Sequence, residues 1–252
     1  MSLWRLEWLR LVRTRRWIGL VGVYVFFGFV GPLTARYLGE IVDFAGGELE
    51  GATIEFPPPV PADGLIQYVS NAMQIGTLVA AVIAAAALTI DAVPEIGVFF
   101  RTRVTPVSRI LRPRLVVTAV VVVAAFVLGA LVAWYETWAL IGAPSAGGVL
   151  SGIGYGALFL GFVVTLVGAI AGRSRSVAGT VMVAIVILLL MPALGIIDAI
   201  GRWLPTRLAG ALAALPAGDA AAVDYLGAAA ITVAAGVLLV WLGARWTERR
   251  EV

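Results

Sequence analysis

Six long apolar runs set the strongest constraint on how this chain can fold. A helix needs about 20 apolar residues to cross the hydrocarbon core of a bilayer. Runs of that kind occupy residues 17–35, 65–90, 115–135, 150–171, 177–199 and 223–244. In a bilayer each backbone amide must find its partner inside the protein, which favours helices. The first run is too long for a signal peptide and is followed by others. The sequence therefore predicts an all-α, polytopic membrane protein with six transmembrane helices.

The composition leaves little room for a soluble domain. The chain is 61% hydrophobic and only 13% charged, with a mean hydropathy of +1.01, whereas about a quarter of the residues of a soluble domain are charged. The longest stretch outside the apolar runs, residues 36–64, is too short to bury a useful core. We therefore expect one membrane domain over residues 1–252.

Three residue types are missing, and their absence excludes several kinds of chemistry. The chain has no Cys and no His, and all its basic residues are Arg. Disulfides, thiolate or imidazole metal sites and a Ser–His pair are excluded, as is a lysine Schiff base. A P-loop also needs a lysine. We expect no catalytic residue and no metal or cofactor in this chain. If P-loop ATP chemistry drives it, a partner chain supplies that chemistry.

The arginines predict which ends of the helices face the cytoplasm. Fifteen of the eighteen fall in segments 1–16, 91–114, 173–175 and 245–250, on one side of the predicted membrane, and the other side has Arg36, Arg202 and Arg207. The positive-inside rule then places both termini in the cytoplasm and segment 36–64 in an outer loop. The arginines follow membrane sidedness rather than forming a basic domain, so we expect no nucleic-acid partner.

The loop between the second and third runs carries more than charge. "EIGVFFRTRVTPVSRILRPR" begins at Glu95 and has five arginines. A positive-inside loop explains the arginines but not Phe99 and Phe100 before them. Glu95 follows a proline and suits the first turn of a short helix. Two phenylalanines on such a helix favour docking into the groove of a partner. A plain charged loop is the alternative.

This loop resembles the cytoplasmic loop of type-2 ABC exporter permeases, the membrane subunits of drug, antibiotic, polysaccharide and lipid exporters. The likeness lies in the Glu-x-Gly segment and the TPVSR element at 105–109. The layout is also similar, with an amphipathic N-terminus, six spans, a long loop after the first and paired Leu-Pro elements within 200–222, which in the family mark short re-entrant outer helices. One departure is Arg112-Pro113-Arg114, where family members often have Gly-Lys.

The resemblance implies a coupling helix within 91–114 that contacts a separate ATPase subunit. That subunit would bind ATP and Mg, and two permeases, identical or sister chains, would form a conduit in the cell membrane. The residues expected to carry the coupling are Glu95, Gly97, Phe99, Phe100, Arg101, Arg103, Thr105 and Pro106.

The first sixteen residues predict an amphipathic helix. Trp4, Trp8 and Leu11 fall on one helical face, with Arg13 on an adjacent one. Tryptophan and arginine at headgroup depth are typical of a helix lying in the membrane interface, and the resemblance implies the same helix beside the ATPase. A charged anchor for the first span is the alternative.

A polar stripe marks the outer half of the second run. Gln67, Asn71 and Gln74 recur at helical spacing, with Ser70 beside them. Polar side chains inside a membrane either hydrogen-bond to other helices or line a cavity. The resemblance favours a substrate pathway, because spans two and five line the conduit in that family. On span five it adds Met182 and Pro192. The glycine pairs 152/156 and 168/172 predict close helix packing.

The leading hypothesis is therefore the transmembrane subunit of an ATP-driven ABC exporter. An autonomous channel or ion-coupled carrier is the alternative, although no mid-span charge or clear inverted repeat favours it. A membrane-embedded enzyme is less favoured, because the acidic residues are scattered. The residues do not indicate which substrate is carried.

Overall fold

The computed structural model describes residues 2–46, 57–89 and 108–249, which form helices and no strand. In chain order the elements are α1 Leu3–Thr14, α2 Arg16–Gly46, α3 Pro61–Asn71, the π-helical η1 Ala72–Gly76, α4 Thr77–Leu88, α6 Ser108–Leu140, α7 Ala146–Ala171, α8 Val177–Leu194, α9 Asp198–Gly201, α10 Pro205–Ala209, α11 Ala211–Ala217, the 3₁₀ turn η3 Ala222–Tyr225 and α12 Leu226–Glu248. Within these ranges, six helical segments are long and apolar enough to cross a membrane. The predicted all-α fold with six membrane-length helices is confirmed.

The helices differ from the expected runs mainly at their ends. The first helix, α2, extends into the expected outer loop 36–64 as far as Gly46. It has a kink at Tyr37, where the backbone is not helical. The fifth ends at Leu194 rather than at 199. Pro192 explains this early end, because proline lacks the N–H that would continue the hydrogen-bond ladder and its ring crowds the preceding turn. The second span is α3, η1 and α4 in continuous succession.

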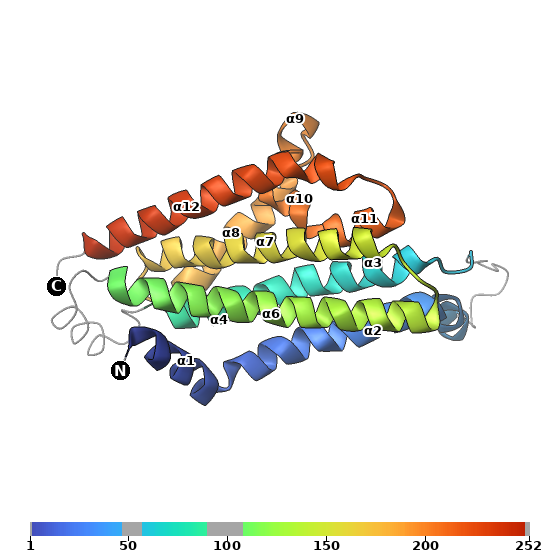
Figure 1. Ribbon diagram of the computed structural model, residues 1–252, viewed down its shortest axis with the longest axis horizontal. Coiled ribbons are helices and arrows are strands. Elements are labelled where there is room, and N and C mark those ends of the chain that lie inside the picture. Colours follow the sequence, from blue (N-terminus) through green and yellow to red (C-terminus); the bar gives the residue numbers. More distant parts are fainter. Residues whose placement is uncertain (1, 47–56, 90–107, 250–252) are drawn as a thin grey trace.

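The bundle has two distinct ends. Helices α2, α6, α7 and α12 run side by side along its long axis (Figure 1). At one end lie α1, the start of α6 and the end of α12. The described arginines of segments 1–16, 108–114, 173–175 and 245–249 all belong to this arginine-rich end. The start of α1 and the end of α12 lie at this same end of the bundle (Figure 1), and the cytoplasmic location of both termini stays a prediction.

An aromatic cluster forms the centre of the bundle. Phe126 on α6 is fully buried between Tyr24 of α2, at a ring-centroid distance of 5.8 Å, and Tyr68 of α3, at 6.3 Å. The Tyr68 hydroxyl donates to the Phe126 carbonyl oxygen at 3.2 Å. Aromatic pairs at these distances contribute beyond the area they bury. Three helices are thereby fixed at one depth of the bundle.

Glycines on α7 let the backbones of neighbouring helices approach it closely. A Cβ atom at Gly152 of α7 would lie 2.5 Å from the Cα of Leu212, and one at Gly172 would lie 2.7 Å from the carbonyl oxygen of Gly243. These distances are too short for any side chain. The close packing predicted for the glycine pairs of span four is therefore confirmed.

The segment after α8 folds back into the bundle. The first Leu-Pro element starts α10, with Pro205 at the first helical position, and the second, Leu215-Pro216, lies in the last turn of α11. Leu208, Ala211 and Leu212 are fully buried, because α11 packs against α7 and α3. This return completes the bundle where α8 has ended.

The central cluster predicts a stability effect. Phe126→Ala is expected to lower the free energy of unfolding by about 3 kcal/mol, because the ring contacts three helices and its removal leaves a cavity. Unfolding in detergent micelles, followed by circular dichroism, measures the loss. Phe29→Ala is the matched control, because its ring on α2 is 44% exposed. Equal losses for both variants would contradict the central role of Phe126.

Candidate functional site

A large cavity lies between the second and fifth spans. It has a volume of about 890 Å³. Its walls come from η1 and α4, from α7 and α8, and from the α9–α10 segment; the lining residues are Met73, Gln74, Thr77, Leu78, Phe159, Leu188, Leu189, Pro192, Gly195, Asp198, Gly201, Arg202, Thr206, Arg207 and Ala209. A cavity of this size with a few polar groups on an apolar wall is typical of small-molecule sites.

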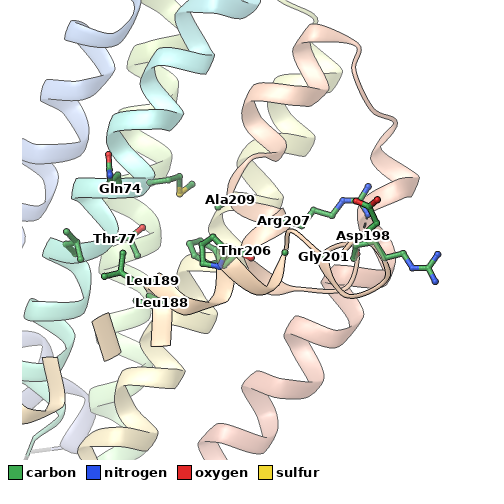
Figure 2. Close-up of a pocket in the computed structure, with 15 residues that line it drawn as sticks. Gln74, Thr77, Leu188, Leu189, Asp198, Gly201, Thr206, Arg207 and Ala209 are labelled. Atoms are coloured by element: carbon green, nitrogen blue, oxygen red, sulfur yellow. Dashed lines mark hydrogen bonds between the residues drawn. The ribbon is translucent and has the colours of Figure 1, made fainter. Parts of the chain in front are cut away.

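The polar groups of the cavity are divided between its two ends. Figure 2 shows Gln74 and Thr77 on one wall, and Asp198 and Arg207 at the opposite end beyond Thr206. Thr77 is buried, and its hydroxyl has no hydrogen-bond partner within the described residues. A buried hydroxyl without a partner has lost its hydration without compensation, so this wall of the cavity holds an unsatisfied polar atom.

The charged end of the cavity is held by aromatic rings. The guanidinium carbon of Arg207 lies 5.1 Å from the ring centroid of Tyr225, and one of its nitrogens donates to the carbonyl oxygen of Arg202 at 3.3 Å. Arg202 lies 5.4 Å from the ring centroid of Trp203. Cation–π contacts orient a guanidinium without neutralising it. In the part of the chain that the structure describes, neither arginine has a carboxylate within 4.0 Å. This end of the cavity is therefore cationic.

A π-helical turn shapes the wall that carries Gln74. The turn covers Ala72–Gly76, and a Cβ atom at Gly76 would lie 2.6 Å from the ring of Tyr24. The close approach of Tyr24 requires glycine there. π turns inside helices are frequent at functional sites. The extra residue changes the helical register, so residues before and after it face different directions.

The other ends of α4 and α8 are joined by a hydrogen bond. The hydroxyl oxygens of Thr89 and Thr180 are 3.2 Å apart, and both residues are buried. Thr180 also donates to the carbonyl oxygen of Ser176, so Thr89 is the donor between the two helices. Pro192 lies about 18 Å further along α8 at the helical rise per residue. The two helices are thus joined at the arginine-rich end, and farther along they form two walls of the cavity.

The structure brings together only two of the six expected pathway residues. Gln74 and Pro192 line the cavity. Gln67 instead lines a separate hollow near Arg36 and Asp63, and its carbonyl oxygen accepts from the Asn71 amide at 3.0 Å.

The other two expected pathway residues lie elsewhere. Ser70 is exposed and Met182 is 69% exposed, and neither lines the cavity. The stripe was predicted from the spacing of a regular α-helix. The π turn at Ala72–Gly76 adds a residue to one turn, so Gln74 faces a different direction from Gln67 and Asn71.

A helix, α1, is present where the interface helix was predicted, and it packs against the bundle through a buried ion pair. Glu7 of α1 accepts from the Arg114 Nε at 2.7 Å, and both side chains are less than a tenth exposed. Trp4 and Trp8 are each 51% exposed. The sequence pattern predicts that the tryptophans lie in the membrane interface, and it assigns no role to Glu7. Glu7 is the only acidic residue among five arginines in residues 1–16, and this was the sequence signal for an ion pair.

The remaining interface-helix residues take different positions. Leu11 lines a crevice between α1 and the bundle, and Arg13 is exposed. The left-handed backbone at Arg15, with φ of 53°, ends α1 and turns the chain into α2. The eight expected coupling residues, from Glu95 to Pro106, lie outside the described residues.

Sequence reasoning missed most of the polar lining of the cavity. Thr77, Asp198, Arg202, Thr206 and Arg207 belong to it but were assigned to a plain helix or to the outer loop. The early end of α8 brings the last four into the site. Within the described ranges, no group of three or more acidic, His or Cys side chains could hold a metal ion.

The cavity wall gives a prediction that uses the lack of native cysteine. In a Gln74→Cys variant the thiol should react with a charged, water-soluble maleimide, because it faces a hydrated cavity. Ile75→Cys is the matched control: Ile75 is also exposed, at 43%, but does not line the cavity. We expect labelling of Cys at 74 to be at least about 10-fold faster, since a thiol in lipid rarely ionises. Equal rates would show that the cavity is not accessible to water.

The ion pair gives a second prediction. Glu7→Gln is expected to destabilise the protein by about 3 kcal/mol, because it leaves the buried Arg114 guanidinium without its carboxylate. Replacing both partners, as Glu7→Leu with Arg114→Met, is expected to restore much of the loss. Thermal unfolding in micelles measures both, with exposed Arg13→Gln as the control. A full loss in the double variant would show that charge pairing is not the cause.

Comparisons with protein-family models, with curated proteins and with solved structures found no match for this chain. The likeness to type-2 ABC exporter permeases therefore stays a hypothesis drawn from the sequence.

Proposed function

We propose that this chain is the membrane subunit of an ATP-driven ABC exporter. The observation that carries the proposal is the cavity of about 890 Å³ between spans two and five. The resemblance to type-2 ABC exporter permeases implies that these two spans line the conduit. Six membrane-length helices are compatible with a transporter subunit. In this proposal two permeases, identical or sister chains, form the conduit, and two ATPase chains that bind ATP and Mg dock on loop 91–114.

The junction of α1 and α6 supports the coupling part of the proposal. Helix α6 begins at Ser108, inside the expected loop 91–114 and two positions after the last expected coupling residue, Pro106, and Arg114 in its second turn holds α1 through Glu7. A displacement of the loop would therefore move the start of α6 and α1 together. ATP binding by the partner would then bias the conduit between two conformations.

The exposure of α8 supports a second permease beside the cavity. Only 11% of its membrane-length window is buried, the least of the six, and Leu189 and Leu190 are 68% and 59% exposed. Leu189 also lines the cavity. A second copy, or a sister chain, packed on this face would close the conduit from the side.

The cavity also supports binding rather than covalent chemistry. Its wall combines leucine and phenylalanine with two neutral hydrogen-bonding groups, Gln74 and Thr77, and its far end is cationic. Such a site can hold an amphipathic solute by its apolar part and orient it by its polar part. Release needs only a change in the separation of α4 and α8, which share the Thr89–Thr180 hydrogen bond at one end.

The proposal predicts a partner. A tagged chain purified in mild detergent from its native membranes is expected to carry a stoichiometric P-loop ATPase, identified by mass spectrometry. Combined Glu95→Ala, Phe99→Ala and Phe100→Ala should lower ATPase recovery at least about 10-fold, as loss of interface hot spots does.

The control removes two exposed aromatic rings at the other end of the molecule. Tyr135 and Trp138 on α6 are 63% and 60% exposed, and Tyr135→Ala with Trp138→Ala should leave ATPase recovery unchanged. If the protein purifies alone and conducts ions or solutes in liposomes, the autonomous channel or carrier is the correct function. If an ATPase is recovered equally with all variants, the docking segment is wrong although the exporter class stands.

A further inference from the structure

A second, narrow crevice lies at the arginine-rich end, where α1 meets the first turns of α2 and α6 and the last turns of α4. Its enclosed volume is only about 40 Å³. It is lined by Glu7, Arg10, Leu11, Thr14, Arg16, Trp17, Leu20, Ile83, Ala87, Arg114, Val117, Thr118, Val121 and Val122. None of these residues belongs to the cavity between spans two and five.

The charged groups of the crevice are unequal in number. Three arginines, Arg10, Arg16 and Arg114, face one carboxylate, Glu7. Arg114 occupies that carboxylate at 2.7 Å, whereas Arg10 reaches it only at 3.6 Å, too far for a hydrogen bond. That Arg10 nitrogen is buried and has no hydrogen-bond acceptor within the described ranges. Among the described residues the crevice thus has more positive than negative charge, and the Arg10 side chain is 39% exposed, which together favour an anion at the opening.

Arg16 adds a second available cation at the opening of the crevice. It is the first residue of α2 and is exposed. No carboxylate of the described residues lies within 4.0 Å of it. The sharp turn at Arg15 places α1 against the bundle and so brings Arg10 and Arg16 to the same crevice.

The rest of the crevice is apolar and lies at the level where membrane-length helices begin. Leu20, Ile83, Val117 and Val121 form its wall. The first and third spans start at Arg16 and Arg109, so the arginines stand at one boundary of the apolar region. Lipid phosphates lie at this boundary, with acyl chains beside the apolar wall. Basic pockets between transmembrane helices are known to bind anionic headgroups.

We propose that this crevice binds an anionic phospholipid of the adjoining leaflet. The headgroup phosphate lies at the opening and accepts from Arg10 and Arg16. An acyl chain lies beside Trp17 and Val121, partly exposed apolar residues of the crevice. The crevice is too narrow to enclose a nucleotide or a peptide, and a bilayer supplies lipid at this depth. The bound lipid would stabilise the docking of α1, because its phosphate adds negative charge beside Arg10 and Arg16. This site does not depend on the proposed exporter function.

Native mass spectrometry of the delipidated full chain tests the proposal. The protein is titrated with dioleoyl phosphatidylglycerol or with dioleoyl phosphatidylcholine, which share acyl chains and differ in net charge. Phosphatidylglycerol is expected to bind about 20-fold more tightly, the effect of two arginines near a headgroup. Arg10→Gln with Arg16→Gln should abolish that preference, and Arg16→Gln alone, at an exposed position, should reduce it about 5-fold.

Two matched variants separate the crevice from general surface charge. Arg5→Gln with Arg13→Gln removes the same charge from exposed positions of α1 outside the crevice and should keep the preference. Arg10→Lys with Arg16→Lys keeps the charge and should keep most of the binding.

Three outcomes would overturn the proposal. One is the absence of a preference in the unaltered protein, and another is an equal loss in both glutamine pairs. The third is full displacement of phosphatidylglycerol by millimolar inorganic phosphate, which would make the crevice a small-anion site instead.

Discussion

The packing of Phe126 against two tyrosines is the interaction on which the bundle depends. In a bilayer the lipid tails are as apolar as leucine, so helices gain little by hiding apolar surface and associate through close packing and hydrogen bonds. The Phe126 ring supplies the packing, and the Tyr68 hydroxyl supplies a bond to the Phe126 carbonyl oxygen. Gly156 of α7 completes the cluster, because a Cβ atom there would lie 2.6 Å from the ring. Four helices therefore meet at one side chain.

With that centre fixed, the fifth span is left outside the tight packing, and the cavity follows from its position. Helix α8 is joined to α4 at Thr89 and Thr180 but ends early because of Pro192. The space beyond is lined partly by the returning α9–α10 segment. A helix held at one end and little buried along its length can change position without disturbing the aromatic centre. This division between a rigid core and a loosely packed helix suits a conduit that changes between two states.

The arginines have two roles in this structure that their positions in the sequence do not distinguish. Most mark one end of the bundle, as membrane sidedness requires. Arg114 is instead buried in an ion pair that docks α1, and Arg10 lies beside it with an unused donor. Removing a guanidinium from water is costly unless an anion compensates it. Among the described residues of the crevice, Arg10 and Arg16 have no carboxylate within hydrogen-bond distance, which is the physical reason to infer a bound anionic lipid.

The sequence by itself determined the class of the fold and the number of membrane-length helices, because a long apolar run has only one way to satisfy its backbone in a bilayer. It also determined the close packing at the glycines of span four, whereas the early end of α8 at Leu194, inside the run expected to reach 199, was not predicted. Only the tertiary structure decided which polar residues share a cavity. A π turn changed the register between Asn71 and Gln74, and a returning segment brought Arg202 and Arg207 to the cavity. Likewise, the pairing of Glu7 with Arg114 joins residues more than a hundred positions apart. Local periodicity carries no information on such contacts, because they depend on how whole helices pack.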